Sequence, residues 1–129
     1  MDTASSPYSK IILSVIIIGL LTASAMLWAK YQWLRVRVAF AEEQIELFED
    51  MRNRALEAEP AKAVGYLDYA SGYYPSGTKQ EEDTRLDRIV EQARASAIRD
   101  IIRDLRIKTG EDLGDDPAAW VTKYAVKTK

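Results

Sequence analysis

The chain has 129 residues and a formal net charge of −2, from 18 basic and 20 acidic side chains. A nucleic-acid-binding protein usually carries a clustered basic excess, so this balance argues against that class. The absence of Cys and His excludes disulfides, thiolate zinc sites and catalysis by Cys or His. The spacing of the acidic residues does not identify a pair of carboxylates that could act together in catalysis either. The sequence therefore predicts a protein that is not an enzyme and that takes no cofactor, metal or small-molecule substrate.

The first predicted element is the uncharged apolar run Ile11–Ala29. As a helix it would span roughly 28 Å, close to the hydrocarbon thickness of a bilayer. Lysine and aromatic side chains at its rims are typical of a membrane interface. We therefore expect a short polar N-terminus at 1–9, a transmembrane helix at 10–29 (the anchor), and the lipid bilayer as a partner. The predicted anchor residues are Lys10, Ile11, Ile16, Leu20, Trp28, Lys30 and Trp33.

A signal peptide is the alternative interpretation of the same run. Ala23-Ser24-Ala25 matches a cleavage site, and the apolar residues before it could form the core of a signal peptide. Cleavage after Ala25 would release a secreted or periplasmic helical binding domain. The apolar run continues past that site to Ala29, which favours retention of the anchor.

The orientation of the anchor follows from its flanking charges. Lys30, Arg35 and Arg37 lie on the C-terminal side, against Lys10 on the N-terminal side. Positive flanks stay in the cytoplasm. The domain that follows the anchor is therefore predicted to be cytoplasmic.

A membrane-proximal helix is predicted at 30–58, because no Pro or Gly interrupts the chain between Leu20 and Glu59. Its apolar residues alternate at spacings of three and four, which is a short heptad seam that begins at Tyr31. The candidate interaction face on this seam consists of Leu34, Val38, Ala41, Ile45 and Phe48.

A second stripe, formed by Trp33, Phe40 and Leu47, widens this apolar face. A wide face favours packing against helices of the same chain, whereas pairing of Arg37 with Glu42 between chains would favour a parallel homodimer. Both interpretations stay open at this point. The opposite face is acidic and is either solvated or a docking surface for a basic partner. Its residues are Glu42, Glu43, Glu46, Glu49 and Asp50.

A small helical domain is predicted at 59–124. Its expected order is a helix that begins at Pro60, a break at 72–77, a long helix from about Asp83 to Thr109, a short helix from Ala118 to about Tyr124, and a frayed tail at 125–129. Gly110 fits the position after a helix, and Asp116-Pro117 fits the start of one. Trp120 is expected to fold back onto the bundle. The fold class is therefore all-α: a transmembrane helix that continues into a long helix, followed by a helical hairpin or bundle.

Three motifs invite a chemical interpretation, and each has a simpler explanation. Residues 72–79 resemble a phosphate-binding loop but end in Thr-Lys after a helix, which fits a turn better. The acidic segment 111–116 offers oxygen ligands for calcium but does not follow the EF-hand order, and caps and turns explain it. Four arginines of the long helix could hold an anion, although interleaved aspartates favour a self-neutralised surface. They are Arg88, Arg99, Arg103 and Arg106.

Within residues 73–124, the segments YYPSGT, LDRIVEQARASAIRDIIRDLR and TGEDLGDDPAAW carry a resemblance. They resemble small uncharacterised bacterial membrane proteins of the planctomycete type, and the last dozen residues resemble the end of HEAT-like helical repeats. No second copy occurs at a fixed period, which separates the chain from a true repeat protein. The resemblance implies an interaction module in a bacterial inner membrane and carries no catalytic residues. The repeat-like pattern maps to Thr109, Gly110, Asp112, Gly114, Asp116, Pro117 and Trp120.

From these features we expect a single-pass membrane protein that acts as a scaffold or minor subunit of a membrane complex. Its partner would be another protein or a second copy of itself. The alternative is the secreted or periplasmic domain released after Ala25. A calcium-binding or enzymatic role for segment 111–116 is the weakest hypothesis.

Overall fold

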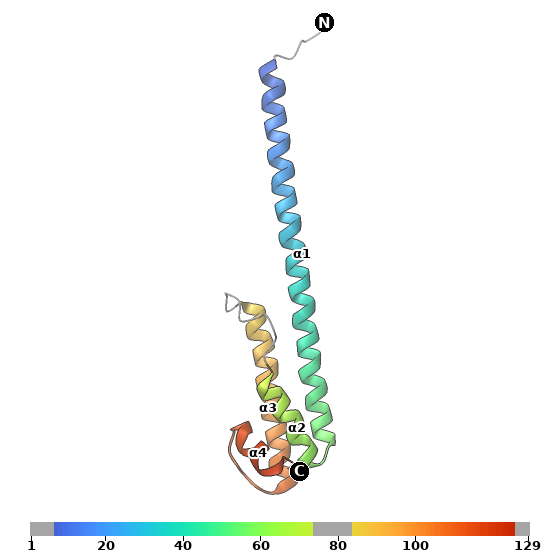
Figure 1. Ribbon diagram of the computed structural model, residues 1–129, viewed down its shortest axis with the longest axis vertical. Helices are drawn as coiled ribbons and strands as arrows, with labels where there is room; N and C mark the ends of the chain where they lie inside the picture. Colours follow the sequence, from blue (N-terminus) through green and yellow to red (C-terminus); the bar gives the residue numbers. More distant parts are fainter. Residues whose placement is uncertain (1–6, 74–83, 126–129) are drawn as a thin grey trace. The chain divides into compact units, whose positions relative to one another are not determined.

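The computed structural model describes residues 7–73 and 84–125. Of these residues, 89% are helical and none is in a strand, which confirms the all-α class. The four helices are α1 (Pro7–Glu57), α2 (Pro60–Gly72), α3 (Arg85–Thr109) and α4 (Pro117–Tyr124) (Figure 1).

From the end of α1 onward, the described helix ends lie within two residues of those expected from the sequence. Helix α1 ends at Glu57 and α2 begins at Pro60, as expected from the proline. Helix α3 begins at Arg85 rather than near Asp83, because the Thr84 side chain accepts a hydrogen bond from the Asp87 backbone N–H and the Asp87 carboxylate accepts one from that of Thr84. This reciprocal pair is a capping box. The predicted break beyond Tyr73 and the predicted tail at 126–129 lie outside the described residues.

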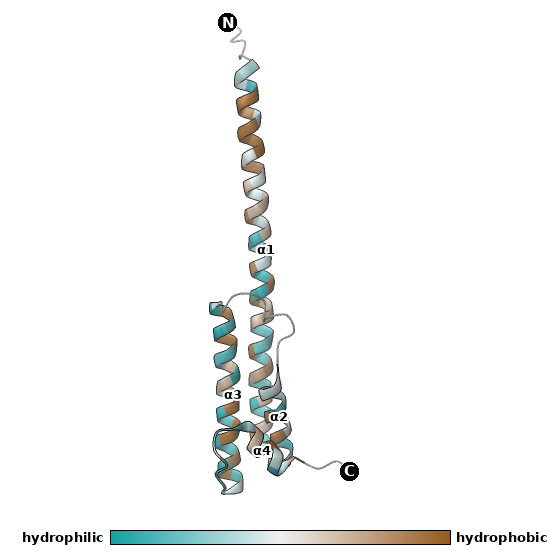
Figure 2. Cartoon of the chain, turned by 60° about the vertical axis from the view of Figure 1, so that its left-hand side comes forward, coloured by the Kyte–Doolittle hydropathy of each residue, from teal (hydrophilic) through white to brown (hydrophobic). Residues whose placement is uncertain are grey.

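The chain divides into two compact units, residues 1–39 and residues 40–129. In the first unit, the described residues form the N-terminal part of α1, whose hydrophobic colour contrasts with the mixed colours of α2, α3 and α4 in Figure 2. The most apolar window of α1 has a mean hydropathy of 2.4 with none of its residues buried. This helix is long and apolar enough to cross a membrane, a property that signal sequences near an N-terminus share.

The second unit is built around α2, which lies against both α3 and α4. Ala55 of α1 and Ala63 of α2 are fully buried in one apolar cluster with Ile101 and Leu105 of α3. Small side chains shorten the distance between packed helix axes, and α2 buries one face, which carries Ala63, Val64, Leu67 and Ala70. Trp120 of α4 is also fully buried in this cluster, as the sequence predicts.

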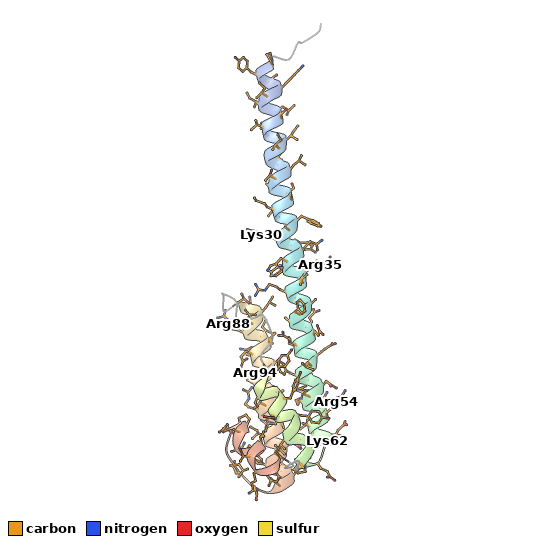
Figure 3. All side chains as sticks on the ribbon, viewed as in Figure 1. Lys30, Arg35, Arg54, Lys62, Arg88 and Arg94 are labelled. Carbon is orange, nitrogen blue, oxygen red and sulfur yellow. The ribbon has the colours of Figure 1, made fainter. Side chains whose placement is uncertain are left out.

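Side chains of α3 close the ends of the two preceding helices. The Lys108 ammonium donates to the carbonyl oxygens of Leu56 (2.7 Å) and Ala58 (2.8 Å) at the end of α1. The Arg94 guanidinium donates to the carbonyl oxygen of Ser71 (3.1 Å) at the end of α2, and Figure 3 labels Arg94 on α3. The last carbonyls of a helix have no partner within it, so these cations stabilise both ends.

Candidate functional site

The predicted anchor residues lie on the helix of the first unit with their side chains exposed. Ile16 is 52% exposed, Leu20 63% and Trp28 65%. The hydroxyl of Ser14 donates to the Lys10 carbonyl (2.9 Å), and Thr22 does the same to Ile18 (2.8 Å). Polar groups satisfied within the helix suit a hydrocarbon environment, where water cannot bond them. The remaining anchor residues are exposed in the same way: Lys10, Ile11, Lys30 and Trp33.

The C-terminal rim of the anchor carries exposed cations and aromatic rings. Lys30 and Arg35 project from α1 in Figure 3. Trp28 and Trp33 are exposed on either side of Lys30 in the sequence. This composition is compatible with an interfacial belt, in which aromatic rings and ammonium groups lie at the level of lipid headgroups.

The candidate interaction face of α1 is divided by the structure. Leu34 is exposed and Val38 is half-buried. Ala41 and Phe48 are buried in a cluster with residues of α2 and α3, and Ile45 packs against that cluster. The part of the seam from Ala41 to Phe48 therefore packs mainly against helices of its own chain.

Sequence reasoning missed an open groove on the flank of α1, with a volume of about 470 Å³. Its apolar lining comes from Phe40, Leu47 and Tyr73, and Phe40 is 58% exposed. Its polar lining is Glu43, Gln44, Glu46 and Asp50. The stripe of Trp33, Phe40 and Leu47 and the acidic face are visible in the sequence. Tyr73 joins them only through tertiary structure, because its ring meets Phe48 edge-on at 5.4 Å between centroids.

The acidic segment 111–116 is occupied by contacts within the chain. Asp112 and Asp115 each accept a hydrogen bond from Arg106, both at 2.8 Å. The Asp112 carboxylate also accepts from the Gly114 backbone N–H, and this bond, followed by Arg106, lowers the pKa of Asp112. Asp116 caps α4 by accepting from the Ala118 backbone N–H. In residues 7–73 and 84–125, no group of three or more acidic side chains is arranged to hold a metal ion.

Glu111 belongs to a separate network with α4. Its carboxylate pairs with the Lys123 ammonium at 2.6 Å and accepts a hydrogen bond from the Tyr124 hydroxyl. The Lys123 ammonium, and then the Tyr124 hydroxyl, hold the pKa of Glu111 below its usual value. The same Glu111 carboxylate raises the pKa of Lys123 and of Tyr124.

Several positions of the repeat-like pattern of residues 109–120 have a structural role. Gly110 ends α3 with a φ of +71°, and Gly114 turns the loop with a φ of +83°. The buried Trp120 ring donates from Nε1 to the Gly114 carbonyl (2.9 Å). The pattern therefore forms a closing loop that holds α4 against α2 and α3.

The four arginines of α3 do not form a single site. Arg106 is held by the closing loop, and Arg103 lies 3.5 Å from Asp100. Arg88 and Arg99 are exposed. The segment that resembles a phosphate-binding loop cannot be placed, because residues 74–79 lie outside the described residues.

Profiles of known protein families, curated protein sequences and solved structures yield no match to this chain. The resemblance to planctomycete-type membrane proteins and HEAT-like repeats stays a prediction.

Proposed function

We propose that this chain is a non-enzymatic, single-pass membrane protein whose helical unit binds protein, as a scaffold or minor subunit of a membrane complex. The observation that carries the proposal is the pairing of two unlike parts in one chain. One is an apolar helix with no buried residue in its core window. The other is a packed helical unit whose acidic residues in the closing loop are committed to caps and ion pairs.

The exposed apolar surface supports membrane anchoring. A soluble protein rarely leaves so many large apolar side chains in water, and Ile11, Leu21 and Leu27 are each at least 60% exposed. In a bilayer these side chains are the favourable ones. The Lys30 and Arg35 flank supports a cytoplasmic location for the helical unit, by the positive-inside rule.

Two measurements on native membranes test this proposal. Alkaline carbonate should leave the protein in the membrane pellet, and chemical crosslinking should recover it with a protein partner or a second copy. Recovery of an uncrosslinked monomer under all conditions would refute the scaffold role. Protease treatment of intact and permeabilised cells should digest the helical unit only after permeabilisation if that unit is cytoplasmic.

The second candidate is a periplasmic or secreted helical domain released after Ala25. It is favoured by Ala23-Ser24-Ala25 and by the position of the apolar helix near the N-terminus. The mass of the mature protein separates the two candidates. A chain that begins at Met26 would replace the anchored protein with the released domain.

A further inference from the structure

We propose that the groove on α1 binds the exposed N-terminal face of α3 from a second copy of this chain. This inference rests on the proposed function in one respect, because copies anchored in the same membrane have the same orientation. It goes further by naming the partner and the two surfaces that meet.

The groove has the chemistry of a site for a basic amphipathic helix. Phe40, Leu47 and Tyr73 provide an apolar lining, and the carboxylates of Glu43 and Glu46 lie beside it. In the part of the chain that the structure describes, these two carboxylates form no ion pair. Helix-in-groove recognition uses such a combination of an apolar lining and complementary charges.

The N-terminal face of α3 has the complementary chemistry. Four positions with spacings of three, one and three lie on one face of the helix, which we call the α3 stripe: Arg85, Arg88, Ile89 and Gln92. Arg85, Arg88 and Gln92 are exposed, and Ile89 is 43% exposed although it is large and apolar. Within residues 7–73 and 84–125, neither arginine has an acidic partner. Ile89 can enter an apolar groove while its arginine neighbours face the carboxylates.

The two surfaces lie at the same level of the second unit. Arg52 of α1 lies 3.7 Å from Asp100 of α3, and Lys108 of α3 bonds the Leu56 carbonyl of α1 at 2.7 Å. Both contacts pair a residue of α1 with one about fifty positions later, so the two helices run side by side in the same direction. By this register, Gln44 in the groove and Gln92 in the α3 stripe are level with each other. Two parallel copies can therefore bring groove and stripe together without inverting either chain.

The test is disulfide crosslinking of full-length chains, which contain no native Cys. One tagged chain carries Gln44→Cys and a differently tagged chain carries Gln92→Cys, so that no charge changes. Both are reconstituted in vesicles of phosphatidylethanolamine and phosphatidylglycerol and oxidised. We expect a mixed disulfide at several times the yield of a control pair, Gln44→Cys with Lys62→Cys, in which Lys62 is an exposed residue of α2.

Charge reversal adds a readout that random collision cannot produce. Glu43→Lys with Glu46→Lys in the Gln44→Cys chain should lower the mixed yield several-fold. Arg85→Glu with Arg88→Glu in the Gln92→Cys chain should then restore it. All four residues are exposed, and far-UV circular dichroism verifies that each variant is folded.

Three outcomes overturn the inference. One is a mixed yield no higher than the control, and another is preferential linkage of Gln44→Cys to itself, which indicates pairing between α1 helices. The third is occupation of the groove by a different basic protein in native membranes, which leaves the proposed function intact. Failure of the proposed function is seen separately, as a mature chain that begins at Met26.

Discussion

Lys108 is the residue on which the end of α1 most depends. Its ammonium bonds two carbonyl oxygens at that end and pairs with the Asp104 carboxylate at 2.7 Å. Three quarters of the side chain is shielded from solvent, with 25% exposed. A cation so placed stabilises the helix end through both hydrogen bonds and the helix dipole.

We predict that Lys108→Met lowers the free energy of unfolding by about 2 kcal/mol, because hydrogen bonds to a charged group contribute ~1.5–3 kcal/mol. The measurement is urea unfolding of the full chain in detergent, followed by far-UV circular dichroism. Lys62→Met is the matched control, because Lys62 is exposed on α2 and its replacement should change stability by less than ~0.5 kcal/mol. Equal effects of the two substitutions would contradict the capping role.

The Lys123–Glu111–Tyr124 network predicts a limited pH range in which it stabilises the closing loop. The folded pKa of Glu111 is lowered from 4.5, so its contribution is present above that value and is lost as pH falls through the lowered pKa. The folded pKa of Lys123 is raised from 10.5 and that of Tyr124 from 10.0. Their contributions are present below those values and are lost as pH rises through the raised pKa values. The network is therefore intact between the two limits.

We expect the fluorescence of Trp120 to report this pH range in a Trp28→Phe, Trp33→Phe background, because Trp120 then is the remaining tryptophan. Its emission should change at both acid and alkaline limits and stay constant between them. Glu111→Gln should weaken both transitions, since the Glu111 carboxylate titrates at the acid limit and raises the pKa values of Lys123 and Tyr124. The control is Glu59→Gln, an exposed residue before α2, which should leave the profile unaltered.

At the scale of the element, two glycines have opposite roles. Gly110 ends α3 at a φ of +71°, where a Cβ is strained. Gly65 lies inside α2, and a Cβ there would meet no atom within 4 Å. The backbone conformation at each glycine, rather than the space around it, therefore determines whether a side chain is tolerated there.

We predict that Gly110→Ala destabilises the helical unit by about 1–2 kcal/mol, the usual penalty of a left-handed residue with a side chain. Gly65→Ala should stabilise it by ~0.5–1 kcal/mol, because alanine loses less backbone entropy in a helix. Thermal unfolding of the two full-length variants under one condition measures both signs. The same sign for both substitutions would refute the assignment of Gly110 as a cap.

Elements that are encoded locally could be predicted from the sequence. Pro60, Gly110 and Asp116-Pro117 mark helix ends through backbone constraints that act over a few residues, and the structure has helices that end or begin there. The hydrogen bonds that Lys108 and Arg94 of α3 make to the ends of α1 and α2 could not be predicted, because they join residues more than twenty positions apart.

The candidate site was predictable to a smaller extent. Periodicity identifies an apolar face on α1 but does not say what covers it, and Phe48 proves to be buried within its own chain. The groove depends on Tyr73, whose position follows from the packing of α2. The anchor residues are exposed along α1, and their role in a membrane stays a prediction.

At the scale of the whole molecule, the proposed anchor makes a prediction about membrane insertion. Ile16→Lys places a charge near the centre of the apolar run, at a penalty of about 2.5–3.5 kcal/mol for insertion. We expect a measurable fraction of this variant to leave the membrane pellet in alkaline carbonate. Gln32→Lys is the control at the rim, where a lysine can reach the headgroups and extraction should not change. Equal extraction of both variants would argue that the helix does not span a bilayer.

The hydrogen bonds that α3 makes to the ends of α1 and α2 also order events during synthesis. Helices α1 and α2 leave the ribosome before α3, so their terminal carbonyls and the Phe48 ring wait for partners that have not yet been translated. The apolar helix needs no such partner, because the hydrogen bonds of a helix lie within it. In the proposed anchored protein, targeting can therefore begin while the helical unit still lacks α3, and the α3 stripe is translated only after the anchor.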